Sequence, residues 1–248
     1  MPADELTPDL DGTGALDLLR SGEVEVLGRM PWSSNATLLV EVRGQLGGEG
    51  ACLRAVYKPR RGERPLWDFP PGLDRREVAA YELSRWLGWG IVPETVLRDE
   101  GLPFGAGSLQ RFVSFDVEAH YFTLLEEPAR HHALRTIGCF DLLANSADRK
   151  GGHCLAGHDG RVWAVDNGLT FHAEPKLRTV IWDFSSQAID DELLAGVRRV
   201  ADTGGPESLA GLIDDVERDA LVVRAAEVVE SGTFPIDTSG RCYPWPLV

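Results

Sequence analysis

The sequence shows no cysteine motif, no membrane-length apolar run and no signal-peptide pattern. Its four cysteines, Cys52, Cys139, Cys154 and Cys242, form no CxxC pair and no zinc-binding spacing. No apolar run approaches the ~20 residues that span a bilayer, and the acidic, polar first residues do not resemble a signal peptide. We therefore expect a cytoplasmic protein with reduced, mostly buried thiols and no stable membrane anchor.

Basic side chains are scarce relative to acidic ones. The 25 Lys and Arg residues stand against 39 Asp and Glu residues, which gives a formal net charge of -14. Such a charge repels nucleic-acid phosphates and anionic lipid headgroups at long range, so we expect no nucleic-acid partner. One local exception is a basic cluster that consists of Lys58, Arg60, Arg61, Arg64, Arg75 and Arg76.

The remaining composition is that of a folded protein. The 248 residues are 43% hydrophobic and 26% charged, which is close to ordinary globular usage. A chain of this length can bury roughly three-quarters of its unfolded surface. It is long enough for one large domain or for two small lobes.

The first half of the chain shows the alternation of apolar and polar residues that is typical of strands. After an N-terminal tail and a short helix (residues 1–22), we expect strands at 23–30, 36–44, 51–58, 91–99 and 108–113. A loop rich in Pro, Arg and Gly at 59–73 precedes an expected helix at 74–89, for which Asp74 is a good N-cap. These elements predict an N-terminal lobe, residues 23–114, with an antiparallel sheet and one inserted helix.

The second half changes character and predicts an α-rich lobe, residues 115–248. We expect a helix at 131–146, a polar loop, and two short strands at 154–158 and 162–166. Helices dominate residues 175–230, and 207–231 is the clearest helical run. The apolar PWPLV sequence at the C-terminal end is expected to dock on the domain. The fold class is therefore α+β, with a β-rich N-lobe and an α-rich C-lobe.

Side chains that suit phosphoryl transfer from ATP occur in the order found in kinases. Ser33, Ser34 and Asn35 lie between the first two expected strands, where small polar side chains and backbone amides can reach phosphates, or where an ordinary hairpin turn forms. Lys58 ends the third strand and can reach phosphates as a compact cation. Kinases pair such a lysine with a helix glutamate, and here Glu77 and Glu82 both compete for that role.

A polar, glycine-rich loop carries the next candidates. Asp148 follows an apolar helix and can orient an acceptor hydroxyl and take its proton. Its neighbours Arg149 and Lys150 are expected to neutralise phosphate charge. The alternative is a solvated turn, which Asp and Gly both favour.

Two further residues are candidate metal ligands. Asp166 ends a short strand before Asn167-Gly168, as a magnesium ligand or as part of a plain hairpin turn. Asp148 and Asp166 flank one expected hairpin, which brings both carboxylates to the same end of it. His153 lies where a kinase places a second metal ligand, although a neutral imidazole suits transition metals better than magnesium, and a structural histidine fits equally well.

Four segments together resemble a known superfamily: YKP at 57–59, REVAAYELSRWLGWGIVPET at 76–95, NSADRKGGH at 145–153 and AVDNGLTF at 164–171. The sequence is similar to the phosphatidylinositol 3- and 4-kinase superfamily, most closely to type II phosphatidylinositol 4-kinases, as a small actinobacterial-type branch. The DNGL sequence followed by Phe is the most specific of these matches.

The resemblance implies a two-lobed, atypical protein-kinase-like fold and a role for each matching residue. Lys58 would contact the ATP phosphates and Glu77 would pair with it. Asp148 would be the catalytic aspartate and Asp166 the ligand of Mg²⁺ or Mn²⁺. The hinge against adenine would consist of Gln110, Arg111, Phe112 and Val113.

Two departures from the family pattern affect the function that we expect. His153 takes the place of the metal-binding asparagine, and the cysteine-rich segment of the type II lipid kinases is absent. We expect an atypical, metal-dependent kinase that transfers the terminal phosphate of ATP to a protein or a small alcohol acceptor. The alternatives are a phosphatidylinositol kinase and a nucleotide-binding pseudokinase, the latter motivated by His153.

Overall fold

The computed structural model describes residues 10, 12–30, 36–238 and 240–248. Its contacts divide the chain into two compact units. The first consists of residues 1–78 and 93–113, and the second of residues 79–92 and 114–248. The domain boundaries predicted from the sequence, after residues 22 and 114, stay predictions.

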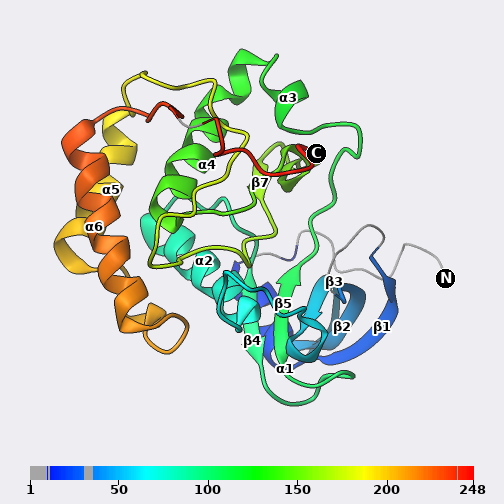
Figure 1. The fold of residues 1–248 in the computed structure, drawn as a ribbon. Helices are drawn as coiled ribbons and strands as arrows, with labels where there is room; N and C mark the ends of the chain where they lie inside the picture. Colours follow the sequence, from blue (N-terminus) through cyan, green and yellow to red (C-terminus); the bar gives the residue numbers. More distant parts are fainter. Residues whose placement is uncertain (1–9, 11, 31–35, 239) are drawn as a thin grey trace. The chain divides into compact units, whose positions relative to one another are not determined.

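The first unit contains the predicted five-stranded antiparallel sheet, in the order β1-β2-β3-β5-β4. Each expected strand is confirmed, with shifts of a few residues at its ends (Figure 1). The elements are α1 (Gly12–Ser21), β1 (Glu23–Arg29), β2 (Leu38–Leu46), β3 (Glu49–Pro59), η2 (Arg60–Gly62), the start of α2 (Leu73–Leu87), β4 (Thr95–Arg98) and β5 (Gly107–Arg111).

Strand periodicity sorts the side chains of β3 onto two faces. Ala55 and Tyr57 are fully buried, whereas Val56 and Lys58 are partly exposed. Successive side chains of a strand point to opposite faces of the sheet, so Lys58 lies on the face opposite to Tyr57. The β3–β5 register places Lys58 opposite Ser108. The lysine is therefore held by a central strand of the sheet.

The start of α2 differs from the sequence prediction. Asp74 is not the N-cap, because the helix already begins at Leu73. The carboxylate of Glu63, from the preceding loop, accepts hydrogen bonds from the amides of Gly72 (3.2 Å) and Leu73 (3.0 Å). Asp74 is buried and accepts a hydrogen bond from Nε of Arg60 at 2.9 Å. A more distant acidic residue therefore satisfies the free amides at the helix start.

The second unit is mainly helical, with one small hairpin. The helix predicted at 207–231 is shorter, because the chain turns at Gly211 (φ +83°) and Asp214 caps a new helix by accepting the amide of Glu217 at 2.8 Å. Helices α5 and α6 lie side by side (Figure 1). The elements are the end of α2, α3 (Tyr121–Leu124), η3 (Pro128–Arg130), α4 (His131–Ala144), η4 (Gly151–His153), β6 (Cys154–Ala156), β7 (Val162–Ala164), α5 (Asp191–Thr203), η5 (Glu207–Leu209) and α6 (Asp215–Ser231).

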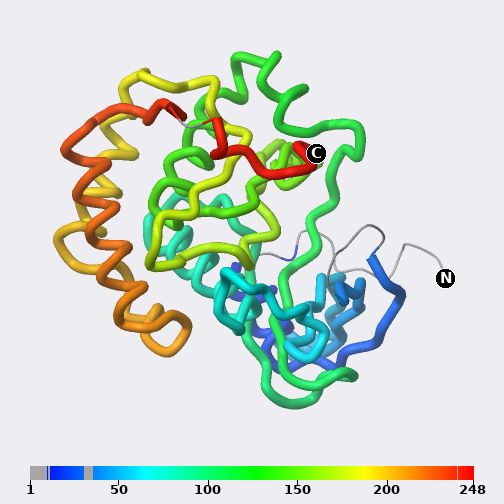
Figure 2. Tube along the Cα trace, in the orientation of Figure 1, coloured from blue at the N-terminus to red at the C-terminus, as the bar shows by residue number. Residues whose placement is uncertain are grey.

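The C-terminal end of the chain docks on the second unit, as the sequence predicts. The carbonyl oxygen of Leu247 accepts a hydrogen bond from the amide of Gly151 at 2.7 Å. Figure 2 shows this segment in red, passing beside the green part of the tube. Among the helices of the described ranges, none combines the length and the hydropathy needed to cross a bilayer.

The four cysteines differ in their access to solvent. Cys52, Cys139 and Cys154 are buried, and Cys242 is partly exposed. Burial raises the pKa of the Cys139 and Cys154 thiols to about 12, and it also raises the pKa of Cys52. Only the thiolate reacts with alkylating reagents, so the buried thiols are protected by both access and protonation.

We expect one thiol to react quickly in the native protein and four in urea. The measurement is the rate of labelling by a thiol reagent near pH 8, with the labelled position identified by peptide mass. Cys242 is the expected fast position. Labelling of Cys139 or Cys154 in the native protein at the rate seen in urea would contradict the burial described here.

Candidate active site

The first candidate pair lies within the first unit. Nζ of Lys58, at the end of β3, contacts Oε1 of Glu77 on α2. The side chain of Glu77 is only 3% exposed, and that of Lys58 is 23% exposed. A charge-assisted hydrogen bond with a buried carboxylate fixes the position of the ammonium group.

The same contacts decide between the two glutamates of α2. Glu82 accepts hydrogen bonds from Arg85 and from Ser208, both at 2.9 Å. Residues five apart on an α-helix point about 140° away from each other, so Glu77 and Glu82 face different surroundings. Glu77 is therefore the partner of Lys58.

Residues 110–113 continue β5 to the end of the first unit. The side chain of Gln110 is buried and donates a hydrogen bond to Oγ1 of Thr95 at 2.9 Å. Arg111 forms an ion pair with Glu94. Residues 112 and 113 complete this segment, which leads directly into the second unit. The segment has the position in the chain that a hinge requires, and its contact with adenine stays a prediction.

Ser33, Ser34 and Asn35 lie outside the residues that the structure describes. Their predicted role stays a prediction.

The loop that carries Asp148 is held on both sides by backbone hydrogen bonds. Asn145, with φ +52°, ends α4 in the left-handed conformation. The amide of Ala147 donates to the carbonyl of Leu169 at 2.8 Å, and the amide of Arg149 donates to the carbonyl of Arg178 at 3.0 Å. These bonds flank Asp148 and fix its backbone against the segment 169–178.

Arg149 lies in surroundings other than those expected from the sequence. Its side chain is fully buried and forms an ion pair with Asp141 at 3.0 Å. The guanidinium also donates to the carbonyl of Val165 (2.7 Å) and to Oδ1 of Asn167 (2.6 Å). A guanidinium that is occupied in this way supports the loop from inside, and it does not reach a phosphate. Nζ of Lys150 lies 3.2 Å from Oδ2 of Asp148, and its contact with phosphate stays a prediction.

Asp141 is the residue of this site that the sequence interpretation missed. It lies on α4, it is fully buried, and it also accepts a hydrogen bond from Thr179 at 3.0 Å. Burial raises the pKa of its carboxyl, and the Arg149 guanidinium opposes that rise. The signal in the sequence was an acidic residue within the apolar run CFDLLA, since charged residues are almost never fully buried unless paired.

The hairpin of β6 and β7 brings Asp166 next to His153. Cys154 pairs with Ala164, and the amide of Val165 donates to the carbonyl of His153 at 3.0 Å. As a result, Nε2 of His153 lies 3.4 Å from Oδ2 of Asp166, a carboxylate that is 53% exposed.

The backbone of Asp166 is in the left-handed region, with φ +59°. An L-residue in this region costs roughly 1–2 kcal/mol, although aspartate tolerates it better than most. Such outliers concentrate at functional sites. The turn at this position presents the carboxylate at the end of the hairpin.

Asp148 and Asp166 lie close enough to influence each other. Burial raises the pKa of the Asp148 carboxyl, and the nearby Asp166 carboxylate raises it further, whereas Lys150 and Arg178 oppose the rise. Two carboxylates that repel each other gain when a cation binds between or beside them. The structure therefore brings together Asp148, Asp166, Lys150 and His153, as their spacing predicts.

The donor set fits a hard divalent cation. Mg²⁺ at nucleotide sites is held by one or two carboxylates together with substrate phosphates, not by a dedicated cage of protein ligands. In the described part of the chain, no group of three or more His, Cys, Asp or Glu side chains is arranged as a metal site on its own. The Asp166 carboxylate falls within the one or two carboxylates that such a shared metal–nucleotide site uses.

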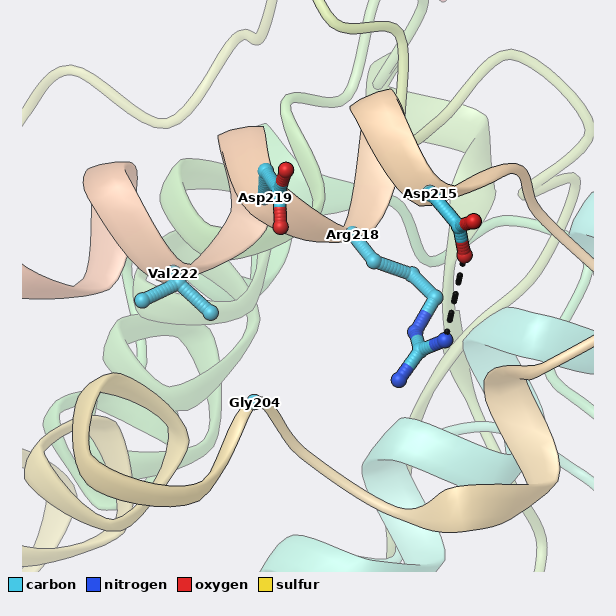
Figure 3. Close-up of a pocket in the computed structure, with 5 residues that line it drawn as sticks. All are labelled: Gly204, Asp215, Arg218, Asp219 and Val222. Carbon is cyan, nitrogen blue, oxygen red and sulfur yellow. Dashed lines mark hydrogen bonds and ion pairs between the residues drawn. The ribbon is translucent and has the colours of Figure 1, made fainter.

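A small surface pocket of about 150 Å³ lies elsewhere in the second unit, beside the end of α5 and the first turns of α6 (Figure 3). Arg218 and Asp215 form an ion pair at its edge, at 3.4 Å. None of the predicted site residues lines it. The lining residues are Gly204, Asp215, Arg218, Asp219 and Val222.

Comparisons with known proteins identify a relative and a fold. No protein-family model matches the sequence. Protein Rv2133c of Mycobacterium tuberculosis is 42% identical over an alignment of 266 positions, which covers 92% of this chain and 94% of that protein. The structure of hydra Fam20 with sugar is similar with a TM-score of 0.55 at 15% identity, covering 90% of this chain and 89% of that one. The Golgi casein kinase with Mn/ADP bound is similar with a TM-score of 0.50 at 13% identity, covering 94% and 80%.

These likenesses confirm the predicted fold class. A β-sheet unit and a helical unit together form a kinase-like fold. Neither of these two structures is a phosphatidylinositol kinase, so the resemblance to that superfamily stays a prediction.

We expect Arg149→Met to destabilise the protein strongly, because it leaves the carboxylate of Asp141 buried without its partner. Removing one member of a buried ion pair typically costs about 3–5 kcal/mol of unfolding free energy. The measurement is urea unfolding followed by circular dichroism.

The matched control is Arg20→Met. Arg20 forms an ion pair with Asp17, and each of the two side chains is 56% exposed. Exposed pairs contribute about 0–1 kcal/mol, so this variant should unfold close to wild type. Equal, small effects of the two variants would contradict the structural role given to Arg149.

Proposed function

The chain belongs to the same family as Protein Rv2133c of Mycobacterium tuberculosis, and we propose that it is an ATP- and metal-dependent kinase. In this proposal the terminal phosphate of ATP moves to a hydroxyl group of a protein or a small molecule. The observation that carries the proposal is the ion pair between Lys58 and the buried Glu77. A lysine held by a helix glutamate is a required part of protein-kinase sites.

Lys58 binds the phosphates of ATP in this proposal. Its ammonium group is partly exposed, so it can contact a ligand while Glu77 holds it in place. Because Glu77 is almost fully buried, its charge needs a cationic partner in the folded protein. This arrangement keeps Lys58 in one position before ATP binds, which lowers the entropy lost on binding.

Asp148 orients the acceptor and receives its proton. The acceptor oxygen forms a bond to the terminal phosphorus as the bond from that phosphorus to the ADP oxygen breaks. The hydroxyl proton passes to the Asp148 carboxylate late in this transfer. Lys150, 3.2 Å from Asp148, is placed to contact the phosphoryl group while it carries developing charge.

Asp166 is the residue that would hold a divalent cation, with His153 beside it. When bound, Mg²⁺ or Mn²⁺ supplies neutralisation of charge on the phosphates. The Golgi casein kinase, which shares the fold, was solved with Mn/ADP bound, and this supports a metal–nucleotide pair here. An imidazole nitrogen is a better ligand for a transition metal such as Mn²⁺ than for Mg²⁺, so His153 favours Mn²⁺.

The remaining nucleotide contacts follow from the resemblance to the phosphatidylinositol kinases. Ser33, Ser34 and Asn35 would cover the phosphates. The segment from Gln110 to Val113 would lie against the adenine base. A lipid acceptor rests on that resemblance alone, and the net charge of -14 disfavours approach to an anionic bilayer. We therefore favour a protein or small-molecule hydroxyl as the acceptor.

We expect Glu77→Gln to lower kcat/KM for ATP about 10- to 100-fold. A hydrogen bond to a charged group is worth about 1.5–3 kcal/mol, and each 1.4 kcal/mol is a factor of ten. The measurement is phosphate transfer or release with ATP and either Mg²⁺ or Mn²⁺. The matched control is Glu82→Gln, which changes a glutamate of the same helix that pairs with Arg85 instead.

Glu82→Gln should retain activity within about twofold of wild type, because it changes a pair with Arg85, whose side chain is 59% exposed, and leaves the partner of Lys58 in place. Loss of activity in both variants to the same extent would point to damage of α2 in general. Unchanged activity in Glu77→Gln would contradict the proposed role of Lys58. Nucleotide binding without turnover in the wild-type protein would favour the pseudokinase alternative.

A further inference from the structure

The chain after α6 returns along the segment that follows Asp166. The amide of Ser186 donates to the carbonyl of Phe234 at 2.9 Å, and the amide of Phe234 donates to the carbonyl of Gln187 at 3.0 Å. Farther along, the carbonyl of Cys242 accepts the amide of Thr179 at 3.0 Å. The two segments therefore run alongside each other in opposite directions.

This returning segment, residues 233–238 and 240–247, ends on the loop of Asp148. We call it the C-terminal strap. Its last backbone contact is the 2.7 Å hydrogen bond from the amide of Gly151 to the carbonyl of Leu247. The side chain of Asp237 shapes the strap by accepting the amides of Gly240 (3.0 Å) and Cys242 (3.2 Å).

Gly151 is packed so closely that a side chain here would meet its neighbours at less than ordinary contact distance. A Cβ atom at this position would lie 3.2 Å from Phe122 and 3.3 Å from the Leu247 carbonyl oxygen. The neighbouring Gly152 is different, since its nearest neighbour, Val248, would be 3.9 Å away, an ordinary contact distance. The strap and Phe122 therefore clamp the loop at one residue.

Trp182 adds a side-chain contact to the strap. Its indole Nε1 donates to the carbonyl of Cys242 at 3.2 Å and to that of Thr179 at 2.7 Å. Its ring also lies 6.3 Å from the ring of Tyr243. One short stretch of the strap thus binds both segments that hold Asp148: its own loop, through Gly151, and the segment around Thr179.

We propose that the C-terminal strap positions the catalytic loop, so that residues far from Asp148 in sequence set the rate of phosphate transfer. This inference rests on the proposed kinase function. The loop of Asp148 is held by two backbone hydrogen bonds. The amide of Arg149 donates to the carbonyl of Arg178, and the amide of Gly151, three residues after Asp148, donates to the carbonyl of Leu247. Without Leu247, the stretch after Arg149 loses its outer contact, and a displacement of about 1 Å at a catalytic group can lower the rate about 100-fold.

The test compares the full chain with a variant that lacks residues 242–248. We expect kcat to fall about 10- to 100-fold, while KM for ATP changes less than about threefold, because the strap acts on the acceptor-orienting loop and not on Lys58. A synthetic peptide of residues 237–248, added in excess, should restore part of kcat. An unchanged kcat, or a kcat that rises because the strap blocks the site, would overturn the proposal.

Point variants keep the proposal testable if the shortened chain does not fold. Gly151→Ala makes contacts of 3.2 Å with Phe122 and 3.3 Å with the Leu247 carbonyl oxygen, which a shift of a few tenths of an ångström would relieve, whereas Gly152→Ala makes an ordinary contact. We expect kcat to fall at least about fivefold more in Gly151→Ala than in Gly152→Ala, with similar melting temperatures. An equal fall in kcat for the two variants would contradict the proposal that the strap holds the loop at Gly151.

Hydrogen exchange separates the strap from the kinase proposal. If the full chain transfers no phosphate, the proposed function fails, and the exchange rate of the Gly151 amide still reports on the strap. We expect this amide to exchange at least about tenfold faster in the variant without residues 242–248. An unchanged exchange rate would show that the strap does not hold the loop.

Discussion

The guanidinium of Arg149 is the group on which the candidate catalytic loop depends. It is fully buried, and it joins α4 through Asp141 to the end of β7 through Val165 and Asn167. Its own backbone amide fixes the loop to Arg178. One side chain thus sets the position of Asp148, immediately before it, relative to the turn that presents Asp166. Burial makes the arrangement rigid, because breaking any of these contacts would leave a charged or polar group without a partner.

The first unit also pairs a buried carboxylate with a cation, but this cation, Lys58, is less buried than Arg149. Glu77 is buried and forms an ion pair with Lys58, whose side chain stays partly exposed to a ligand. Each unit therefore holds an ordered ionic group of its own. In the first unit the cation is partly exposed, which suits contact with phosphates. In the second unit the cation is buried, and two carboxylates are presented instead.

The sequence predicted the elements well, because strand alternation and helical periodicity are local patterns. It also predicted that Asp148 and Asp166 would lie at the same end of one hairpin, because a short hairpin leaves little freedom in where its two ends lie. The residue pattern alone left Glu77 and Glu82 open as partners of Lys58, and only the resemblance favoured Glu77, because the choice depends on which side chain of α2 contacts Lys58 in the fold. It placed Arg149 among phosphate ligands because the buried Asp141, eight residues earlier in the chain, comes into contact with it only in the fold. The contact of Leu247 with Gly151 joins residues far apart in sequence, and no local pattern reports it.

The most direct test of the central claim follows the terminal phosphate of labelled ATP with the purified protein and Mg²⁺ or Mn²⁺, beside an Asp166→Ala variant. The account predicts label in the protein or in an added hydroxyl acceptor, or released labelled phosphate, and none of these with Asp166→Ala. Neither transfer nor hydrolysis by the wild-type protein with either metal would contradict it. Equal transfer by the two proteins would contradict the role given to Asp166 and, with it, the assignment of this hairpin to the active site.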